Sequence, residues 1–456
     1  MQRVLNLLKR IGFDRALLYA LTSKGWAVIE RPITLTLIAT CMTAQARGFY
    51  FTFASVLALG VFFELGIGVV LTQFYGHEAA YFRLRPDGTF DGSWPHIDRF
   101  RSLLRQAFKW YCGIAILVVV CIGTAGAIFF GQRPSEGVSW TFAWWGVVVV
   151  SATTAPLQPF ISALEGMGLV AEVQRLRLAS NVLGGLLLWG CLLLRGGLLA
   201  SWCLPLGGIL CTSALLSIRY RPFIKFVFAR DPLTKEIKWW EEIWPMQWKI
   251  AVSWISGYFI SQLFAPVLFR FQGPVIAGRM GMSMAVGVSV MAVGVIPIVV
   301  KAPFFAQLIS KRDYLELDKL FRRSGLLSLG MSAIATIGAI TIIALFNGYT
   351  QYGDRFLPTW QVVCLIITYA LLCIPQAQAI YLRAHKQEPF LMLNVVGGIA
   401  TGLVAVLGGI WYSSAGQCLP YLLVTVMIGL PWSTYVFYRC RREWHKPAEL
   451  CTEAER

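Results

Sequence analysis

The sequence is poor in the residues that keep a protein dissolved in water. Charged residues make up only 14% of its 456 residues, against about 25% in soluble proteins, whereas hydrophobic residues make up 57%. The mean hydropathy of +0.63 agrees with this imbalance. Because so few charges cannot cover the surface of a soluble domain of this length, we expect lipid to solvate most of the apolar surface.

Catalytic and metal-binding patterns are missing as well. The sequence has no P-loop, no HExxH motif and no Gly-x-Ser-x-Gly motif, and its four histidines all lie in predicted cytoplasmic connections. The eleven cysteines include no CxxC pair and lie mostly within apolar stretches, where cysteine is a small, lipid-compatible residue. We therefore expect no enzyme activity, no catalytic residue, no bound metal and no cofactor.

What the sequence does have is a succession of apolar stretches long enough to cross a bilayer as helices. Twelve such stretches predict an all-α, polytopic membrane protein. The first is the least regular, because Lys24, Glu30, Arg31 and Pro32 interrupt it. The predicted spans are residues 14–42, 48–75, 104–130, 138–164, 174–195, 198–218, 245–269, 276–302, 323–347, 356–382, 388–412 and 418–438.

Positive charge is distributed unevenly between the two sides of the predicted membrane. With a cytoplasmic N-terminus, roughly 32 of the 40 Lys and Arg residues lie in the termini and the even-numbered connections. The positive-inside rule then predicts a multi-pass membrane protein with both termini in the cytoplasm. Anionic lipid headgroups account for the net charge of +17, so no nucleic-acid partner is expected. The odd-numbered connections hold only Arg47, Arg133, Arg195, Arg270, Arg279 and Arg355.

A long polar connection after the sixth span divides the chain into six spans and six. Residues 219–244 mix basic residues with Trp239, Trp240 and Trp244, which is typical of a helix at the headgroup level. The predicted organisation is an N-terminal six-helix bundle over residues 1–218, a cytoplasmic amphipathic linker over 219–244, a C-terminal six-helix bundle over 245–438 and a cytoplasmic tail over 439–456.

A weak internal repeat fits this division. A shift of 230 positions aligns Gly48 with Gly278 and Phe74 with Phe304. Two halves with an even number of spans each would be parallel repeats about an axis along the membrane normal.

Ionisable residues inside the predicted spans are the first candidates for function, because each costs about 2.5 to 3.5 kcal/mol at a helix centre. In the first span, Lys24 and Arg31 are seven residues apart and share one helix face, with Glu30 beside Arg31. That face cannot be exposed to lipid, so the first span is expected to line the interior.

The second predicted span carries one carboxylate among small residues. Gly60, Glu64, Gly68 and Thr72 recur at every fourth position, which places Glu64 in a groove that a helix or a ligand can approach closely. Two interpretations stay open: Glu64, Arg31 and Lys24 form a charged lumen for a polar cargo, or they form a buried ion pair that fixes helix packing. If transport is coupled to an ion, Glu64 is the candidate coupling residue.

Three further cations lie near the ends of predicted spans seven and eight. Arg270 and Arg279 flank a short outward turn, and Lys301 lies near the inner end of span eight. The two arginines either rim a cationic portal or extend to lipid phosphates at the interface.

Three segments resemble a known family. Residues 47–80 (RGFYFTFASVLALGVFFELGIGVVLTQFYGHEAA), 163–180 (ALEGMGLVAEVQRLRLAS) and 378–391 (QAIYLRAHKQEPFL) are similar to bacterial polysaccharide biosynthesis proteins of the oligosaccharide flippase (Wzx-like) type, within the multidrug/oligosaccharidyl-lipid/polysaccharide exporter superfamily. The resemblance implies a MATE-like fold, two six-helix bundles around a central cavity. It also implies transfer of an undecaprenyl-diphosphate-linked oligosaccharide, such as an O-antigen precursor, from the cytoplasmic to the periplasmic leaflet.

The resemblance further implies a monomer, a possible H+ or Na+ coupling ion, and glycosyltransferases and a polysaccharide polymerase as functional neighbours. A cationic lumen suits the anionic diphosphate, so Lys24 and Arg31 become candidates for contacting the cargo. Two other functions remain open. A cation-coupled multidrug antiporter of the same fold needs a carboxylate-dominated lumen, and a non-transporting scaffold in an envelope assembly needs no lumen charge at all.

Overall fold

The computed structural model describes residues 15–85, 90–132, 137–229, 236–349, 353–385 and 387–445. Within these residues the chain is helical apart from one antiparallel hairpin, in which β1 (Phe82–Leu84) pairs with β2 (Phe90–Gly92). The chain divides into two compact units, Met1–Tyr258 with Gly273–Gly278, and Phe259–Gln272 with Arg279–Arg456.

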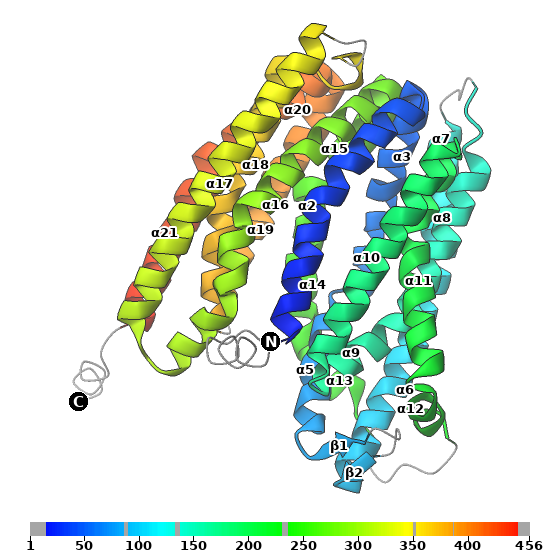
Figure 1. The fold of residues 1–456 in the computed structure, drawn as a ribbon, viewed down its shortest axis with the longest axis vertical. Coiled ribbons are helices and arrows are strands. Elements are labelled where there is room, and N and C mark those ends of the chain that lie inside the picture. The colour runs from blue at the N-terminus through cyan, green and yellow to red at the C-terminus, as the bar shows by residue number, and fades with distance from the viewer. Residues whose placement is uncertain are drawn as a thin grey trace, which may run out of the picture. The chain divides into compact units, whose positions relative to one another are not determined.

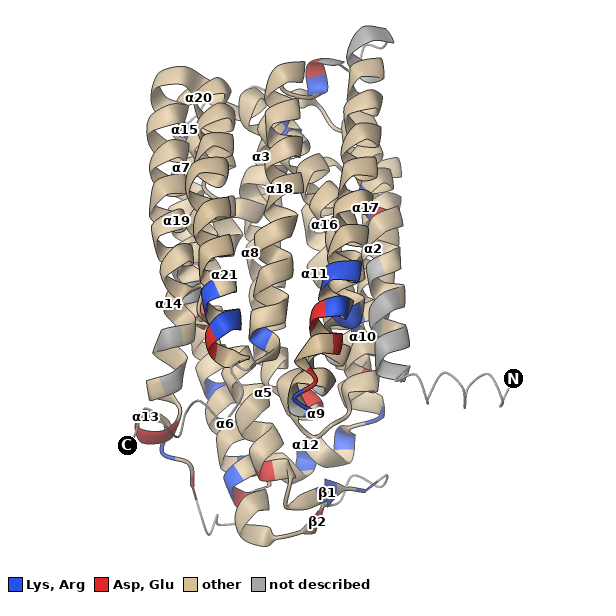
Figure 2. Ribbon diagram, turned by 90° about the vertical axis from the view of Figure 1, so that its left-hand side faces the viewer, with Lys and Arg blue, Asp and Glu red and all other residues tan. Residues whose placement is uncertain are grey.

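The first unit holds the helices from α2 to α13 and nearly all of α14 (Figure 1). Its charged residues gather at the end that carries β1, β2 and α12 (Figure 2), as expected for the polar connections of a membrane protein. Its helices, with η marking 3-10 and π segments, are α2 (Arg15–Cys41), α3 (Ala44–Leu57), η1 (Ala58–Gly60), α4 (Val61–Glu64), α5 (Ile67–Ala79), α6 (Trp94–Leu117), η2 (Val118–Ile122), α7 (Gly123–Gly131), α8 (Thr141–Thr154), η3 (Ala155–Leu157), α9 (Gln158–Gly166), α10 (Val170–Leu193), η4 (Gly197–Leu199), α11 (Ala200–Ile218), α12 (Arg221–Val227), α13 (Trp239–Glu242) and α14 (Trp244–Ser261).

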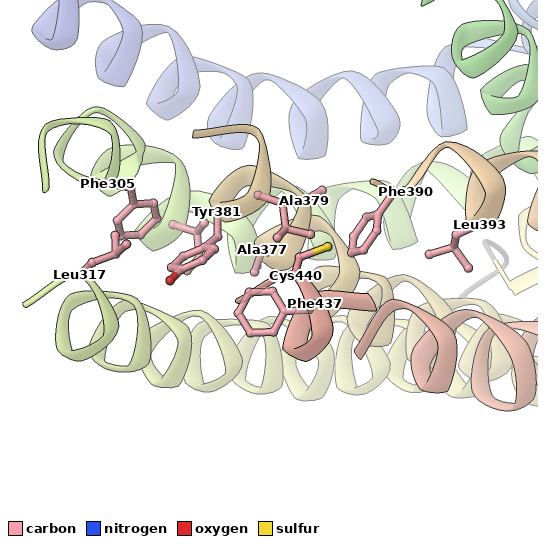
Figure 3. Packing of buried hydrophobic residues seen from close by; sticks show 11 residues of the cluster. Phe305, Leu317, Ala377, Ala379, Tyr381, Phe390, Leu393, Phe437 and Cys440 are labelled. Carbon is pink, nitrogen blue, oxygen red and sulfur yellow. The ribbon is translucent and has the colours of Figure 1, made fainter. Parts of the chain in front are cut away.

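The second unit is built around long helices. Its core at one end is aromatic: the Tyr381 ring lies 5.2 Å from that of Phe437, and both residues are labelled in Figure 3. The ring of Phe321, which packs against this cluster, lies 4.7 Å from that of Tyr381. Its elements are α15 (Phe264–Gln272), α16 (Pro274–Ser310) from Arg279 onward, α17 (Tyr314–Tyr349), η5 (Gly353–Arg355), α18 (Thr359–Ala384), α19 (Leu391–Leu403), η6 (Val404–Gly408), α20 (Gly409–Val424), η7 (Thr425–Gly429) and α21 (Leu430–Trp444).

Each of the twelve predicted spans lies on helix in the described residues. By length and apolar composition alone, nine described helices can cross a membrane, and ten if the bent pair formed by α14 and α15 is counted as one span. One of the nine, Leu391–Trp444, has 54 residues; as one straight helix it would be about 80 Å long at 1.5 Å per residue, far more than one bilayer crossing needs.

That long stretch is a helical hairpin. The chain reverses at Ser413, where φ is 58° and ψ is −145°. After the reversal the two arms pack closely, since a Cβ on Gly408 would lie 1.9 Å from the Gly416 carbonyl oxygen. α2, which carries Lys24, Glu30 and Arg31, is not among the nine, and the number of twelve crossings stays a prediction. The all-α, polytopic membrane fold is confirmed.

The second predicted span is broken within its apolar stretch. Leu65 (φ 53°) and Gly66 (φ 64°) both adopt the left-handed conformation and separate α4 from α5. The expectation of one continuous groove from Gly60 to Thr72 is therefore wrong, because the fourfold spacing assumed an unbroken helix. Leu65 is the unusual member of the pair, since a residue with a side chain adopts this conformation at a cost of order 1 to 3 kcal/mol.

The predicted linker, residues 219–244, packs against α6 over its described parts. Arg105 Nε donates to the Val227 carbonyl at 2.6 Å, and Gln106 Nε2 donates to the Ile237 carbonyl at 3.1 Å. Ile237 is buried, and its N–H donates to Ser102 Oγ at 3.3 Å. These contacts make the described parts of the connection a folded element of the first unit. The division of the chain into two six-helix bundles at this connection stays a prediction.

Candidate functional site

The polar face of α2 is packed against α10 in the first unit. Thr34 Oγ1 donates a hydrogen bond of 2.7 Å to Glu30 Oε1, and Trp189 Nε1 donates one of 2.8 Å to Thr34 Oγ1. The rings of Trp26 and Trp189 are 5.6 Å apart. We call Trp26, Glu30, Thr34 and Trp189 the α2–α10 cluster. Three of them, at positions 26, 30 and 34, recur every four residues and so share one face of α2.

A glycine opposite Glu30 lets the two helices approach. A Cβ on Gly185 would lie 3.3 Å from Glu30 Cγ and 3.4 Å from the Trp26 ring, so a larger residue there would push α2 away from α10. Asn181 Nδ2 continues the contact with a bond of 3.3 Å to Ser23 Oγ. The cluster therefore places a half-buried carboxylate beside two indole rings.

Arg31 lies next to this cluster on α2. Its Nη1 atom is buried, and among the described residues it has no hydrogen-bond partner. Such a group costs free energy unless a ligand, water or ion satisfies it. Lys24 lies on α2, but its side chain is outside what the structure describes.

Glu64 occupies a second polar position, at the break between α4 and α5. The hydroxyl of Tyr111 donates to Glu64 Oε1 at 3.2 Å, and Ser162 Oγ donates to the Gly68 carbonyl at 3.3 Å. Although the helix is broken, a Cβ on Gly68 would still lie 3.7 Å from Glu64 Oε1. The half-buried carboxylate therefore keeps a small-residue neighbour and one hydroxyl donor.

The break itself is covered by α14. A Cβ on Gly66 would lie 2.7 Å from Ile250 Cγ2 and 3.4 Å from the Trp254 ring, and the Phe62 and Tyr258 rings are 5.6 Å apart. Apolar side chains of α14 therefore cover the break between α4 and α5.

In the described residues, no ion pair joins Glu64 to Arg31, and none joins Glu30 to either residue. Lys24, Glu30, Arg31 and Glu64 all belong to the first unit. The side chains of the last three are described, and no two of them form an ion pair.

The other three predicted cations belong to the second unit. Arg270 is exposed on α15. Arg279 Nη2 is 4.0 Å from Oδ1 of the highly exposed Asp354, a pair worth little energy. Lys301 Nζ lies 5.0 Å from the centre of the Phe304 ring, a cation–π contact.

A charged network at the polar end of the first unit was not predicted from the sequence. Glu78 on α5 is 3% exposed and accepts hydrogen bonds from Arg99 Nε at 2.9 Å; its other oxygen is 2.7 Å from His96 Nδ1. Arg99 Nη2 also donates to Glu242 on α13 at 2.5 Å. One arginine thus joins α5, α6 and α13.

The ionised form of Glu242 is favoured in this network. Burial opposes its ionisation, but hydrogen bonds from Arg99 and from the Lys238 backbone N–H outweigh burial and lower the pKa of Glu242. The sequence signal that was available is an acidic pair, Glu241 and Glu242, following the basic region of residues 219–238. The hydropathy of the sequence does not indicate which residue either carboxylate contacts.

Metal chemistry has no candidate site in the described part of the chain. The described His, Cys, Asp and Glu residues form no group of three that could hold a metal ion.

No protein-family model and no curated protein matches the sequence. Solved structures do match. An inward-facing multidrug resistance MATE family transporter of the MOP superfamily is 13% identical, with a TM-score of 0.57 over 91% of this chain and 99% of that chain. The lipid II flippase MurJ, in an inward closed conformation, is 11% identical, with a TM-score of 0.63 over 92% of this chain and 87% of that chain.

A third neighbour is a MATE in complex with MaL6, which is 12% identical with a TM-score of 0.53 over 94% of this chain and 96% of that chain. At such low identity the likeness shows the fold alone. The expected MATE-like fold is confirmed, and the closer resemblance to oligosaccharide flippases stays a prediction.

Proposed function

We propose that the chain is a transporter that moves an undecaprenyl-diphosphate-linked oligosaccharide from the cytoplasmic to the periplasmic leaflet by alternating access. The observation that carries the proposal is the buried Nη1 of Arg31 on α2, which has no hydrogen-bond partner among the described residues. The MATE-like fold is compatible with it, because one solved neighbour of that fold is the lipid II flippase MurJ.

The charge of Arg31 favours a polar, anionic cargo. A guanidinium within a span is expensive, and pairing with a diphosphate would repay part of that cost through bidentate, charge-assisted hydrogen bonds. Lys24, seven residues earlier on the same predicted face, would add a second positive charge. In this proposal the two residues contact the diphosphate, and the indole rings of the α2–α10 cluster offer faces on which sugars can stack.

The test is transfer of a lipid-linked oligosaccharide across proteoliposome membranes. Wild type is compared with Arg31→Ala, Lys24→Ala and the charge-preserving Arg31→Lys, with Arg175→Ala as a matched control because Arg175 is an exposed arginine on α10. We expect Arg31→Ala to lower the rate at least tenfold, Arg31→Lys to lower it less, and Arg175→Ala to leave it unchanged. Equal rates for wild type and Arg31→Ala, with both proteins folded, would rule out this role for Arg31.

A cation-coupled multidrug antiporter is the second candidate function. It is supported by Glu30 and Glu64, two half-buried carboxylates that form no ion pair among the described residues, and by the MATE transporters among the neighbours. Wild-type proteoliposomes that expel cationic dyes in a cation gradient, and do not move the lipid, would favour it over the flippase.

The setting proposed for either activity is a bacterial inner membrane, with both termini in the cytoplasm and the chain acting as a monomer. Glycosyltransferases would supply the lipid-linked cargo and a polysaccharide polymerase would use it on the other side. The third candidate, a non-transporting scaffold, predicts that polymer export survives neutralisation of Arg31 but fails when the cytoplasmic connections are truncated.

A further inference from the structure

Two histidines lie together where α17, α18 and α21 meet in the second unit. His385 directly follows α18, and His445 directly follows α21. Their ring centres are 5.7 Å apart, and the Trp444 ring lies 4.8 Å from that of His385. The ring of His445 also stacks on Tyr314 of α17 at 4.2 Å. The proposed transport function uses neither histidine.

Polar contacts join the same three helices. The Tyr381 hydroxyl on α18 donates to Asp318 Oδ1 on α17 at 3.1 Å, and its oxygen lies 3.4 Å from His445 Nε2. Arg441 on α21 forms an ion pair with the other carboxylate oxygen of Asp318. The end of α21 is therefore attached to α17 by an ion pair and to α18 by the contact of His445 with Tyr381.

The contacts of His385 fix which of its nitrogens carries the proton. Its Nδ1 atom is 3.2 Å from the Tyr381 carbonyl oxygen, and a carbonyl can only accept, so Nδ1 is the donor. In the neutral ring Nε2 therefore carries a lone pair. Nε2 is buried and has no hydrogen-bond partner in the described part of the chain. Protonation would place a charged N–H there with no described group to accept it, which costs free energy.

The charges around the two rings also oppose protonation. Burial lowers the pKa of both histidines from 6.5, and His385 and Arg441 lower that of His445 further, although Asp318 raises it and the Tyr381 carbonyl raises that of His385. The other described charged side chains near these helix ends are exposed: Lys311, Arg312, Asp313, Glu316, Lys319, Arg322, Arg323, Arg383, Glu388, Arg439, Arg442 and Glu443.

We propose that His385 and His445 form an acid-sensitive latch. With both rings neutral, the latch holds the end of α21 against α17 and α18. Protonation of either ring places a positive charge beside the other ring and Arg441, and the last turns of α21 separate while the membrane-spanning parts of the unit stay folded. The latch is closed above pH 6.5 and opens as the pH falls below it. It does not depend on which cargo the chain carries.

The latch responds to the pH on one side of the membrane. The ends of α18 and α21 lie in basic parts of the sequence, which the positive-inside rule assigns to the cytoplasm. Acidification of the cytoplasm would therefore release the end of α21.

A cysteine near the latch supplies the readout. Cys440 on α21 is 9% exposed and belongs to the buried cluster that contains Tyr381 and Phe437 (Figure 3). It lies five residues before His445, so opening of the latch uncovers its thiol. Cys373 and Cys418 are buried free thiols in predicted spans of the same unit and stay covered unless the whole unit unfolds.

The test is thiol labelling of the full-length purified protein in detergent at 25 °C, at pH 7.5 and pH 5.5. The reagent is 4,4′-dithiodipyridine, and labelled cysteines are quantified by mass spectrometry. Each rate is divided by that of the same thiol in the unfolded protein at the same pH, which removes the pH dependence of the chemistry. We expect the relative rate of Cys440 to rise several-fold at pH 5.5, while Cys373 and Cys418 stay protected.

Variants assign the response to the histidines. Asparagine keeps a donor for the Tyr381 carbonyl but takes up no proton, so His385→Asn should reduce the rise and His385→Asn/His445→Asn should remove it. His77→Asn is the matched control, because His77 is exposed on α5 of the first unit, and it should respond like wild type.

Three results would overturn the proposal. One is an unchanged relative rate of Cys440 at pH 5.5 in wild type, and another is an equal rise in wild type and the double variant. The third is labelling of Cys373 and Cys418 together with Cys440, because the unit would then unfold as a whole instead of opening at the latch.

Discussion

Gly48 on α3 and Gly278 on α16 pack backbone against backbone in the first unit. A Cβ on Gly278 would lie 2.7 Å from the Gly48 amide nitrogen, and a Cβ on Gly48 would lie 1.9 Å from the Pro274 carbonyl oxygen. The sequence shift of 230 residues pairs the same two glycines. Neither position has room for a side chain, so the contact depends on glycine at both.

Gly48→Val should therefore destabilise the folded protein. The added side chain meets backbone that cannot move aside, and overpacking of this kind costs about 1 to 3 kcal/mol. The measurement is the apparent unfolding temperature in detergent, which should fall by several degrees. Gly113→Val on α6 is the control, because a Cβ there has nothing within 4 Å. Equal unfolding temperatures for the two variants would show that the Gly48 contact is not close.

Arg99→Ala should release α13 from the first unit. The substitution removes the hydrogen bonds of 2.9 Å to Glu78 and 2.5 Å to Glu242, and hydrogen bonds to charged groups contribute about 1.5 to 3 kcal/mol. Amide hydrogen exchange of residues 236–243 should accelerate by about 10- to 100-fold. Arg83→Ala, at an exposed arginine on β1, is the control. Unchanged exchange in Arg99→Ala would mean that other contacts hold α13.

The second unit should lose stability in mild acid through two histidines just outside its predicted spans. Burial lowers the pKa of both His385 and His445 from the ordinary value of 6.5, although the Tyr381 carbonyl opposes the shift for His385 and Asp318 opposes it for His445. His385 and Arg441 lower the pKa of His445 further. In mild acid the unfolded chain then binds more protons than the folded chain. The contribution of the two neutral histidines to the free energy of unfolding is therefore intact above pH 6.5 and is lost as pH falls below it.

The apparent unfolding temperature at pH 8, 6 and 5 measures this effect. The double variant His385→Asn/His445→Asn should show a smaller fall between pH 8 and pH 5 than wild type. A fall of the same size in both proteins would assign the acid sensitivity to other groups.

Glu64→Gln should abolish the dependence of transport on an ion gradient if Glu64 is the coupling residue. The amide keeps the shape of the side chain and its contact with Tyr111 but can neither bind a proton nor balance a cation. Transport in proteoliposomes is measured with and without proton and sodium gradients. Glu30→Gln is the matched comparison, since Glu30 is the other half-buried carboxylate. A retained gradient dependence in Glu64→Gln and its loss in Glu30→Gln would move the coupling role to Glu30.

Part of the contact pattern on α2 could be predicted from the sequence. Trp26, Glu30 and Thr34 recur every four residues, so their common face was visible in the sequence. The seven-residue spacing of Lys24 and Arg31 predicted a different face of α2 as the functional one. Which helix this face packs against was not visible, because a four-residue spacing identifies a face and not its partner.

The sequence by itself determined the helical class and the predicted spans. In a bilayer every backbone polar group must bond within the chain, so an apolar stretch of about 20 residues has essentially one structure to adopt. Only the tertiary structure decided that Trp189 meets Thr34, that Leu65 and Gly66 break a span, and that Arg99 joins Glu78 to Glu242. These depend on contacts between residues far apart in the chain, and hydropathy, which is a local average, contains no information about them.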